Sequence, residues 1–79
     1  MTFKLYYFAL LQDQRGLAEE MVSSEAQTVA QLYSELKEQH GFTLSQETLR
    51  VSVNEQFAEW DATLSDGDEV VFIPPVSGG

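Results

Sequence analysis

The opening residues alternate side chains in the two-residue period of a β-strand. Residues 3–8 read Phe-Lys-Leu-Tyr-Tyr-Phe, and aromatic and bulky apolar residues of this kind favour strands. The alternation puts every second side chain on the face that we expect in the core: Phe3, Leu5 and Tyr7. Tyr6 and Phe8 then leave apolar surface on the opposite face, a candidate contact patch, although we expect loops or the next strand to cover it more readily than a partner does.

The clearest predicted element is a helix over residues 29–40. Its apolar side chains recur at helical spacing and form one stripe, made of Val29, Leu32, Tyr33, Leu36 and His40. Thr28 with Gln31 three residues later is typical of a capping box at the start of a helix. Gly41 suits a left-handed cap at its end. A single amphipathic helix of this kind has to bury its stripe against a sheet.

The other segments predict short strands joined by polar connections. We expect a polar connection over residues 9–16, a second strand over 17–23 that Gly16 turns back antiparallel to the first, and a loop over 42–47. The remaining strands are expected at residues 49–53, 56–58 and 69–73. Asn54-Glu55 and Asp66-Gly67 are predicted turns, and Leu64 is expected to fill the core between them.

This order of elements predicts an α+β fold: one mixed sheet of four to five strands with one main helix packed across one face. It resembles the ubiquitin-like β-grasp fold, in which the last strand lies centrally. The 79 residues suffice for one small domain, which we expect over residues 1–73, followed by a flexible C-terminal tail over residues 74–79. Without cysteine, no disulfide or thiolate metal site assists folding.

Charge narrows the classes of partner. Thirteen acidic residues against four basic ones give a net charge of −9, which argues against nucleic-acid binding and disfavours an anionic membrane surface. It fits a partner with a basic docking surface, although acidity also serves solubility alone. No signal peptide or apolar run of membrane-spanning length is present in the sequence, and we expect a cytoplasmic location.

The tail predicts the chemistry. Pro74 and Pro75 lack backbone N–H groups, so they end the preceding strand and keep the next residues extended, over roughly 20 Å for six residues. Gly78 and Gly79 have no side chains, and a backbone this slim passes through a narrow channel. The only reactive group at its end is the Gly79 carboxylate, which becomes electrophilic once an enzyme converts it to an acyl-adenylate.

The other candidate sites have weaker support from the sequence. His40 is the only histidine, and in a last helical turn it complements the helix dipole more readily than it binds a metal. Asp66, Asp68 and Glu69 lack the spacing of a calcium loop and suit a solvated turn. Ser77 has no histidine patterned beside it. We therefore expect no metal, no permanently bound cofactor and no active-site side chains in this chain, which looks like a substrate for other enzymes.

The end of the sequence resembles the small subunit of molybdopterin synthase, a family of ubiquitin-like sulfur carriers. The most specific part runs from Leu-Ser-Asp-Gly-Asp-Glu-Val at residues 64–70 to Phe-Ile-Pro-Pro-Val-Ser-Gly-Gly at residues 72–79. Val53-Asn54 and, more loosely, residues 8–11 extend it over nearly the whole chain. One departure is Gln12, where the family often has a basic residue, and this puts the contacts of that loop in doubt.

The resemblance implies a reaction sequence centred on Gly79. An adenylating enzyme of the ubiquitin-activating type would use ATP to form the Gly79 acyl-adenylate, and a sulfurtransferase would supply sulfur for a thiocarboxylate. The tail would then enter the large synthase subunit, in a heterotetramer of two carriers on a large-subunit dimer, and give its sulfur to cyclic pyranopterin monophosphate. The residues that would guide the tail are Pro74, Pro75, Val76, Ser77 and Gly78.

Two other functions share the same tail. One is a carrier for thiazole synthesis in the thiamin pathway, a related family that also ends in Gly-Gly, although Pro-Pro-Val-Ser fits the molybdopterin type better. The other is a ubiquitin-like modifier that is joined to lysines. The tail alone does not separate carriers from modifiers.

Overall fold

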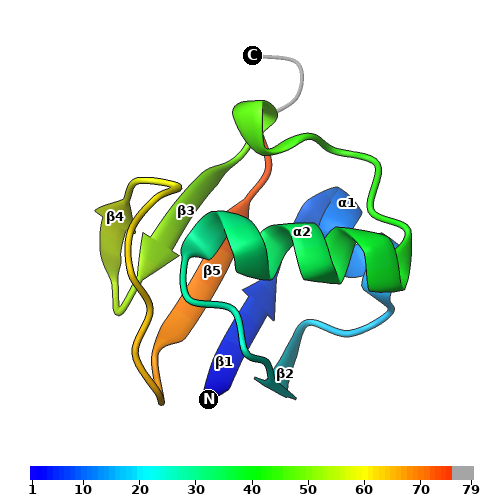
Figure 1. Cartoon of the computed structure of the whole chain (residues 1–79). Coiled ribbons are helices and arrows are strands. Elements are labelled where there is room, and N and C mark those ends of the chain that lie inside the picture. The colour runs from blue at the N-terminus through cyan, green and yellow to red at the C-terminus, as the bar shows by residue number, and fades with distance from the viewer. Residues whose placement is uncertain (76–79) are drawn as a thin grey trace.

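A mixed five-stranded sheet with the strand order β2-β1-β5-β3-β4 is the framework of the protein. The structure, a computed structural model, describes residues 1–75. The strands are β1 (Thr2–Tyr7), β2 (Glu19–Ser23), β3 (Arg50–Val53), β4 (Gln56–Ala58) and β5 (Glu69–Ile73). The helices are α1 (Ala9–Arg15), α2 (Val29–His40) and the short 3-10 helix η1 (Gln46–Thr48). The main helix α2 lies across one face of the sheet (Figure 1).

The last strand, β5, occupies the centre of the sheet. It runs parallel to β1, with Leu5 opposite Val70, and antiparallel to β3, with Val51 opposite Phe72. The pairs β1–β2 and β3–β4 are antiparallel. The α+β class, the central last strand and the ubiquitin-like β-grasp arrangement are therefore as predicted from the sequence.

The core lies between α2 and the sheet. The stripe of α2 is buried at Val29, Leu32, Tyr33 and Leu36, each with 2% or less of its surface exposed. The strands contribute alternate residues to the same cluster: Phe3, Leu5, Tyr7, Val51, Val70 and Phe72. Leu64 joins them, as predicted, with 4% exposure. Each such aliphatic or aromatic side chain stabilises the fold by roughly 1.5–3 kcal/mol when fully buried.

The ends of α2 have the expected caps with one variation. The Thr28 hydroxyl oxygen accepts a hydrogen bond from the Gln31 backbone N–H at 3.2 Å. The Gln31 side chain reaches back to the N–H of Gln27 at 2.8 Å, one residue before the partner that it has in an ordinary capping box. Gly41 closes the helix in the left-handed conformation, with φ of 69°.

The turn between β3 and β4 places two residues that are not glycine at positive φ. Asn54 and Glu55 have φ of 53° and 70°. Asparagine tolerates this region well, whereas glutamate adopts it at a cost in backbone strain. The Asn54 side chain offsets that cost, because it donates to Asp68 and accepts from the backbone N–H of Glu69, both at 2.9 Å.

The prediction for residues 9–16 is wrong. They form helix α1, in which only Leu11 is buried, and not a polar connection. The N-cap residue Phe8 makes no side-chain capping bond, and Ala9 has φ of 51°. Polar contacts to distant segments hold the helix: the Gln14 side chain donates to the Thr43 hydroxyl at 2.9 Å and accepts from its N–H at 3.3 Å.

Strand and loop boundaries differ from prediction by small amounts. The second strand begins at Glu19, two residues later than expected, and the third at Arg50, one residue later. Part of the loop predicted over residues 42–47 contributes to η1. Among residues 1–75, no helix has both the length and the apolar character that crossing a bilayer requires.

Candidate functional site

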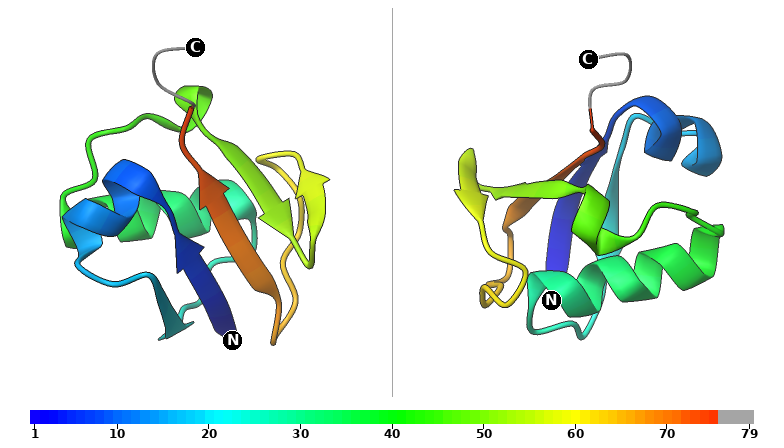
Figure 2. Two further views of the ribbon diagram at one scale, coloured as in Figure 1. Left: turned by 180° about the vertical axis from the view of Figure 1, so that it is seen from behind. Right: turned by 90° about the horizontal axis from the view of Figure 1, so that it is seen from above.

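The tail leaves the sheet from its central strand. Ile73 is the last residue of β5 in the ladder and pairs with Arg50 of β3. Pro74, which lacks an N–H, follows directly and is half-buried, and Pro75 is exposed. Figure 2 shows this end of the sheet from behind and from above, with β5 between β1 and β3. The other predicted tail residues, Val76, Ser77, Gly78 and Gly79, lie outside the described residues.

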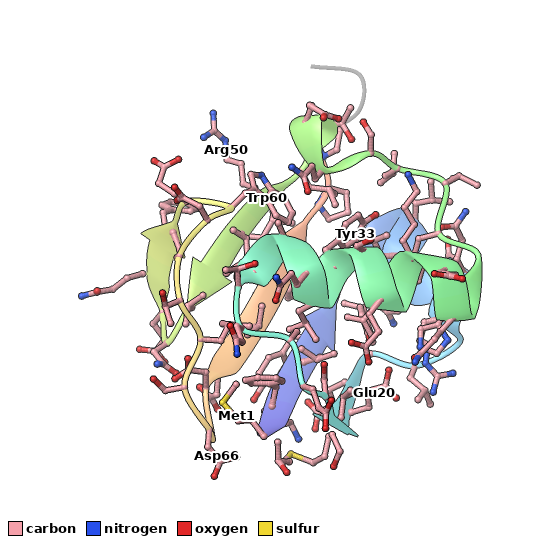
Figure 3. The ribbon with its side chains drawn as sticks, viewed as in Figure 1. Met1, Glu20, Tyr33, Arg50, Trp60 and Asp66 are labelled. Atoms are coloured by element: carbon pink, nitrogen blue, oxygen red, sulfur yellow. The ribbon has the colours of Figure 1, made fainter. Side chains whose placement is uncertain are left out.

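Aromatic packing fixes the root of the tail. Phe72 is fully buried, with its ring centroid 5.1 Å from that of Tyr33 and 6.2 Å from that of Trp60. The Tyr33 hydroxyl donates to the Leu44 carbonyl at 2.6 Å, which holds this ring in place. The ring centroids of Tyr33 and Trp60 lie 5.7 Å apart, along the edge of α2 in Figure 3. A rigid root limits the conformational entropy that is lost when a partner receives the tail.

Two grooves flank Arg50 at this end of the sheet. One, of about 440 Å³, lies beside the tail and is lined by Glu47, Thr48, Leu49, Arg50, Ile73, Pro74 and Pro75. The other, of about 220 Å³, lies toward β4 and is lined by Leu49, Arg50, Val51, Phe57, Ala58, Glu59 and Trp60. Arg50 itself is exposed, and Figure 3 shows its side chain extending away from the body of the molecule.

The sheet face opposite α2, here called the outer face, carries exposed apolar side chains. Phe8 is 51% exposed and Phe57 is 76% exposed, while Tyr6, Val71 and Ile73 are half-buried. A groove of about 270 Å³ runs over this face and is lined by Tyr6, Phe8, Glu55, Glu69 and Val71. Large apolar groups gathered in this way mark surfaces that bind other proteins. The prediction that Tyr6 and Phe8 face outward is confirmed, and a contact with another protein through them stays a prediction.

Phe57 and Arg50 are the outer-face residues that the sequence analysis missed. Phe57 lies opposite Ser52 of β3 and therefore on the same face as Val71. The strand β4 has only three residues, which is too short for an alternation pattern to show which side is exposed. The sequence does not single out Arg50. Its position opposite Ile73 depends on the register between two strands that are distant in sequence.

The predicted acidic turn has structural roles at the other end of β5. The Asp66 carboxylate accepts from the backbone N–H of Thr2 at 2.7 Å. Asp68 accepts from the N–H of Ser65 at 2.7 Å and from the Asn54 side chain at 2.9 Å. These bonds tie the turn to the start of β1 and to the β3–β4 turn, so its carboxylates are used in holding the sheet together.

Glu20 is the centre of a polar cluster that is separate from the acidic turn. Its carboxylate accepts two bonds from the Arg15 guanidinium, both at 2.8 Å, and one from the Tyr7 hydroxyl at 2.7 Å. The Arg15 and Tyr7 bonds hold the pKa of Glu20 below its ordinary value. His40 lies 4.0 Å away, and burial lowers its pKa. The cluster joins α1, β1, β2 and the end of α2 on the side of the sheet that faces α2, so we assign it to stability.

The groove beside Pro74 and Pro75 is lined by two ionisable side chains, Glu47 and Arg50. Within residues 1–75, no group of three histidine or acidic side chains is arranged to hold a metal ion. What the site offers is a rigid strand end, an apolar outer face beside it and one exposed guanidinium. These are features of a surface that is recognised by another protein.

Comparison with known proteins agrees with this description. The family model that matches is that of the ThiS family, and the match spans residues 5–79. One relative, the molybdopterin synthase sulfur carrier subunit of Escherichia coli (strain K12), is 33% identical over 79 residues, which cover 96% of this chain and 98% of the relative.

Several solved structures share the fold. SAMP1 of Haloferax volcanii matches with a TM-score of 0.80 and 24% identity over 100% of both chains. A Pyrococcus furiosus protein assigned as subunit 1 of molybdopterin converting factor matches with a TM-score of 0.78 and 29% identity, over 96% of this chain and 99% of that one. A complex of subunits 1 and 2 of molybdopterin-converting factor from Helicobacter pylori contains a chain with a TM-score of 0.69 and 21% identity over 100% of both chains.

The family match over nearly the whole sequence and the full-length relative lead to one conclusion: this chain belongs to the ThiS family of ubiquitin-like sulfur carrier proteins.

Proposed function

We propose that this protein carries sulfur on Gly79 for molybdopterin synthesis. The observation that carries the proposal is a Pro-Pro-Val-Ser-Gly-Gly sequence placed directly after the central strand, in a chain whose full-length relative is a molybdopterin synthase sulfur carrier subunit. In this proposal the globular part is a handle that partner enzymes hold, and the Gly79 carboxylate is the reacting group.

Loading takes place in two steps on an activating enzyme. The Gly79 carboxylate attacks the α-phosphate of ATP, which releases pyrophosphate and leaves an acyl-adenylate. A sulfur nucleophile at the oxidation level of sulfide then attacks the acyl carbon and displaces AMP, which leaves a thiocarboxylate. Dividing one difficult substitution into two easier ones is the ordinary advantage of an activated intermediate. ATP is thus a substrate of the activating enzyme and not a cofactor of this chain.

Delivery takes place on a second partner, the large subunit of molybdopterin synthase. The thiocarboxylate enters that subunit and gives its sulfur to cyclic pyranopterin monophosphate, in a heterotetramer of two carriers and two large subunits. The Helicobacter pylori complex of subunits 1 and 2 supports a partnership of this kind. On this chain, the outer face around Phe8, Phe57 and Ile73 is the docking surface, because it adjoins the root of the tail.

Intact mass spectrometry tests the proposal. The protein is produced together with the activating enzyme and sulfurtransferase of the same organism, and we expect the mass increase of one oxygen-to-sulfur exchange, located at Gly79 by fragmentation. Transfer of that sulfur to cyclic pyranopterin monophosphate on addition of the large subunit completes the test. Sulfur loading without such transfer would contradict the molybdopterin assignment and favour thiazole synthesis.

Deletion of Gly79 is the matched control. We expect loading to be abolished, because the reacting carboxylate is displaced by one residue. The thermal midpoint should stay unchanged, since among residues 1–75 the buried cluster consists of residues that precede Pro74. A variant that unfolds would contradict the view that the tail acts only in chemistry.

A second candidate function is that of a protein modifier. It is favoured by the fold similarity to SAMP1, at a TM-score of 0.80 over both whole chains. The same acyl-adenylate would then pass to a cysteine and finally to a lysine amine. Isopeptide adducts ending at Gly79 on other proteins, in cells where the thiocarboxylate is not found, would support this function over that of a sulfur carrier.

A further inference from the structure

Arg50 combines two features: like Lys37 it makes no ion pair with residues 1–75, and unlike Lys37 it lines the groove beside the root of the tail. The chain has four lysine and arginine residues. Lys4 pairs with Glu19 at 3.1 Å and Arg15 pairs with Glu20 at 2.8 Å. Arg50 makes neither an ion pair nor a side-chain hydrogen bond with residues 1–75, although Glu47 and Glu59 line the grooves on its two sides. Its guanidinium is exposed at the strand end (Figure 3).

The fold does not need a guanidinium at this position. Arg50 occupies an exposed site at the first position of β3, and the buried residue of that strand end is Val51, with 2% exposure. A β-branched residue would suit a strand better than arginine does. The side chain is therefore better explained by what it meets outside the chain than by what it contacts within it.

Arg50 lies where a partner that holds the root of the tail would cover it. The residue lies opposite Ile73 in the ladder, and it lines the same groove as Pro74 and Pro75. We expect an enzyme that holds the chain at the exit point of the tail to remove water from this groove. A guanidinium that loses its water without gaining an acceptor is costly, whereas a carboxylate partner satisfies it with two parallel hydrogen bonds.

We propose that Arg50 pairs with a carboxylate side chain of the enzyme that adenylates Gly79. The inference rests on the proposed function. It names the activating enzyme as the partner because sulfur carriers and protein modifiers both need the adenylation of Gly79. The pairing implies that the charge of the partner surface changes sign near Arg50. The net charge of −9 favours a partner surface that is basic overall, but the point that faces the root of the tail is acidic. Arg50 then fixes the orientation in which the protein docks as its tail enters the enzyme.

The test measures ATP–pyrophosphate exchange by the activating enzyme of the same organism, with this protein as the varied substrate. Arg50→Gln is compared with Lys37→Gln, which removes the same charge from α2 on the other side of the sheet, where Lys37 also forms no ion pair with residues 1–75. We expect Arg50→Gln to raise KM by about tenfold or more with little change in kcat, as loss of a docking contact does. Lys37→Gln should stay within about twofold of wild type.

Two further measurements separate docking from general charge. Arg50→Lys keeps the charge but lacks the planar fork, so its KM should fall between those of wild type and Arg50→Gln. Rising salt concentration should reduce the difference between wild type and Arg50→Gln. Circular dichroism and a thermal melt of each variant verify the fold.

The results also distinguish this inference from the proposed function. If wild type is activated and Arg50→Gln has the KM of Lys37→Gln, the Arg50 pairing is wrong and the proposed function stands. If Arg50→Gln binds more tightly than wild type, the partner is basic at this point and the pairing is again wrong. If wild type supports no pyrophosphate exchange, the proposed function fails, and the inference fails with it.

Discussion

Along β5, neighbouring residues belong to two different environments. Val70 and Phe72 point toward α2 and have no exposed surface, and the ring of Phe72 lies within 6.2 Å of two other aromatic rings. Val71 and Ile73 point to the outer face and are half-buried beside exposed Phe8 and Phe57. The hydrophobic effect acts on all of these side chains, but only the inner ones are fully buried against other parts of residues 1–75.

The difference assigns separate tasks to the two faces. The inner face holds the root of the tail in position, since its side chains contact α2 and the aromatic cluster. The outer face keeps apolar surface available next to that root, at a cost in solubility that the net charge of −9 offsets. Substitutions on the inner face should therefore affect stability, and those on the outer face should affect recognition.

The largest effect is expected from Phe72→Ala. Removing a fully buried ring leaves a cavity and should lower the free energy of unfolding by about 3–5 kcal/mol, enough to unfold much of a small domain. Urea denaturation followed by circular dichroism measures the change. The control is Val71→Ala on the same strand, for which we expect a loss below about 1.5 kcal/mol. Equal losses from both variants would refute the division of the sheet into two faces.

Phe57→Ser tests the outer face. The side chain is 76% exposed, so the free energy of unfolding should change by no more than about 0.5 kcal/mol. In the pyrophosphate exchange assay we expect KM to rise on the order of tenfold, because exposed aromatic residues near an interface centre contribute strongly to binding. Met21→Ser, 61% exposed on the distant edge strand β2, is the control and should leave KM unchanged. A large KM change in both variants would point to general hydrophobicity instead.

Tyr7→Phe tests how much the hydrogen bond at the edge of the inner face contributes to stability, apart from the apolar packing at its centre. The substitution keeps the ring, whose centroid lies 5.7 Å from that of Phe42, and removes the hydroxyl that donates to Glu20. We expect a loss of about 1–2 kcal/mol in urea denaturation, as for a hydrogen bond to a charged acceptor. Tyr6→Phe, whose hydroxyl makes only an exposed 3.4 Å contact with Glu69, should change stability by less than about 0.5 kcal/mol.

The smallest effect is expected in the pH dependence of stability. The pKa of Glu20 is lowered in the folded protein, chiefly by Arg15, so the charged carboxylate stabilises the fold above the ordinary pKa of glutamate. That contribution is lost as pH falls through the lowered pKa. The stability difference between wild type and Glu20→Gln should therefore shrink from neutral to strongly acidic pH. A difference that stays constant would show that Glu20 acts through packing and not through its charge.

The parts of the fold that depend on local patterns could be predicted from the sequence. The α2 stripe, its caps at Thr28 and Gly41 and the turn at Gly67 all follow from residues a few positions apart. Helix α1 could not, because only Leu11 is buried and because its bonds from Gln14 to Thr43 join segments that are distant in sequence. A seven-residue helix depends on such tertiary contacts for its stability.

The candidate site also has one part that could be predicted from the sequence and one part that could not. The tail is recognisable because proline and glycine have chemical consequences wherever they occur, and Pro74 follows the last strand directly. The surface around it depends on strand register. That Arg50 lies opposite Ile73, and Phe57 opposite Ser52, follows from the pairing of β3 with β5 and β4, which no short stretch of sequence specifies.

The central place of β5 also has a mechanical consequence. A pull on Pro75 runs along the strand and loads the ladders to β1 and β3 together, with four paired residues on each side. Because the ladder bonds lie across the direction of pulling, they share the load as shear and do not peel apart one after another. An unfolding motor that gripped the chain by this end would have to tear the middle of the sheet before any edge came loose.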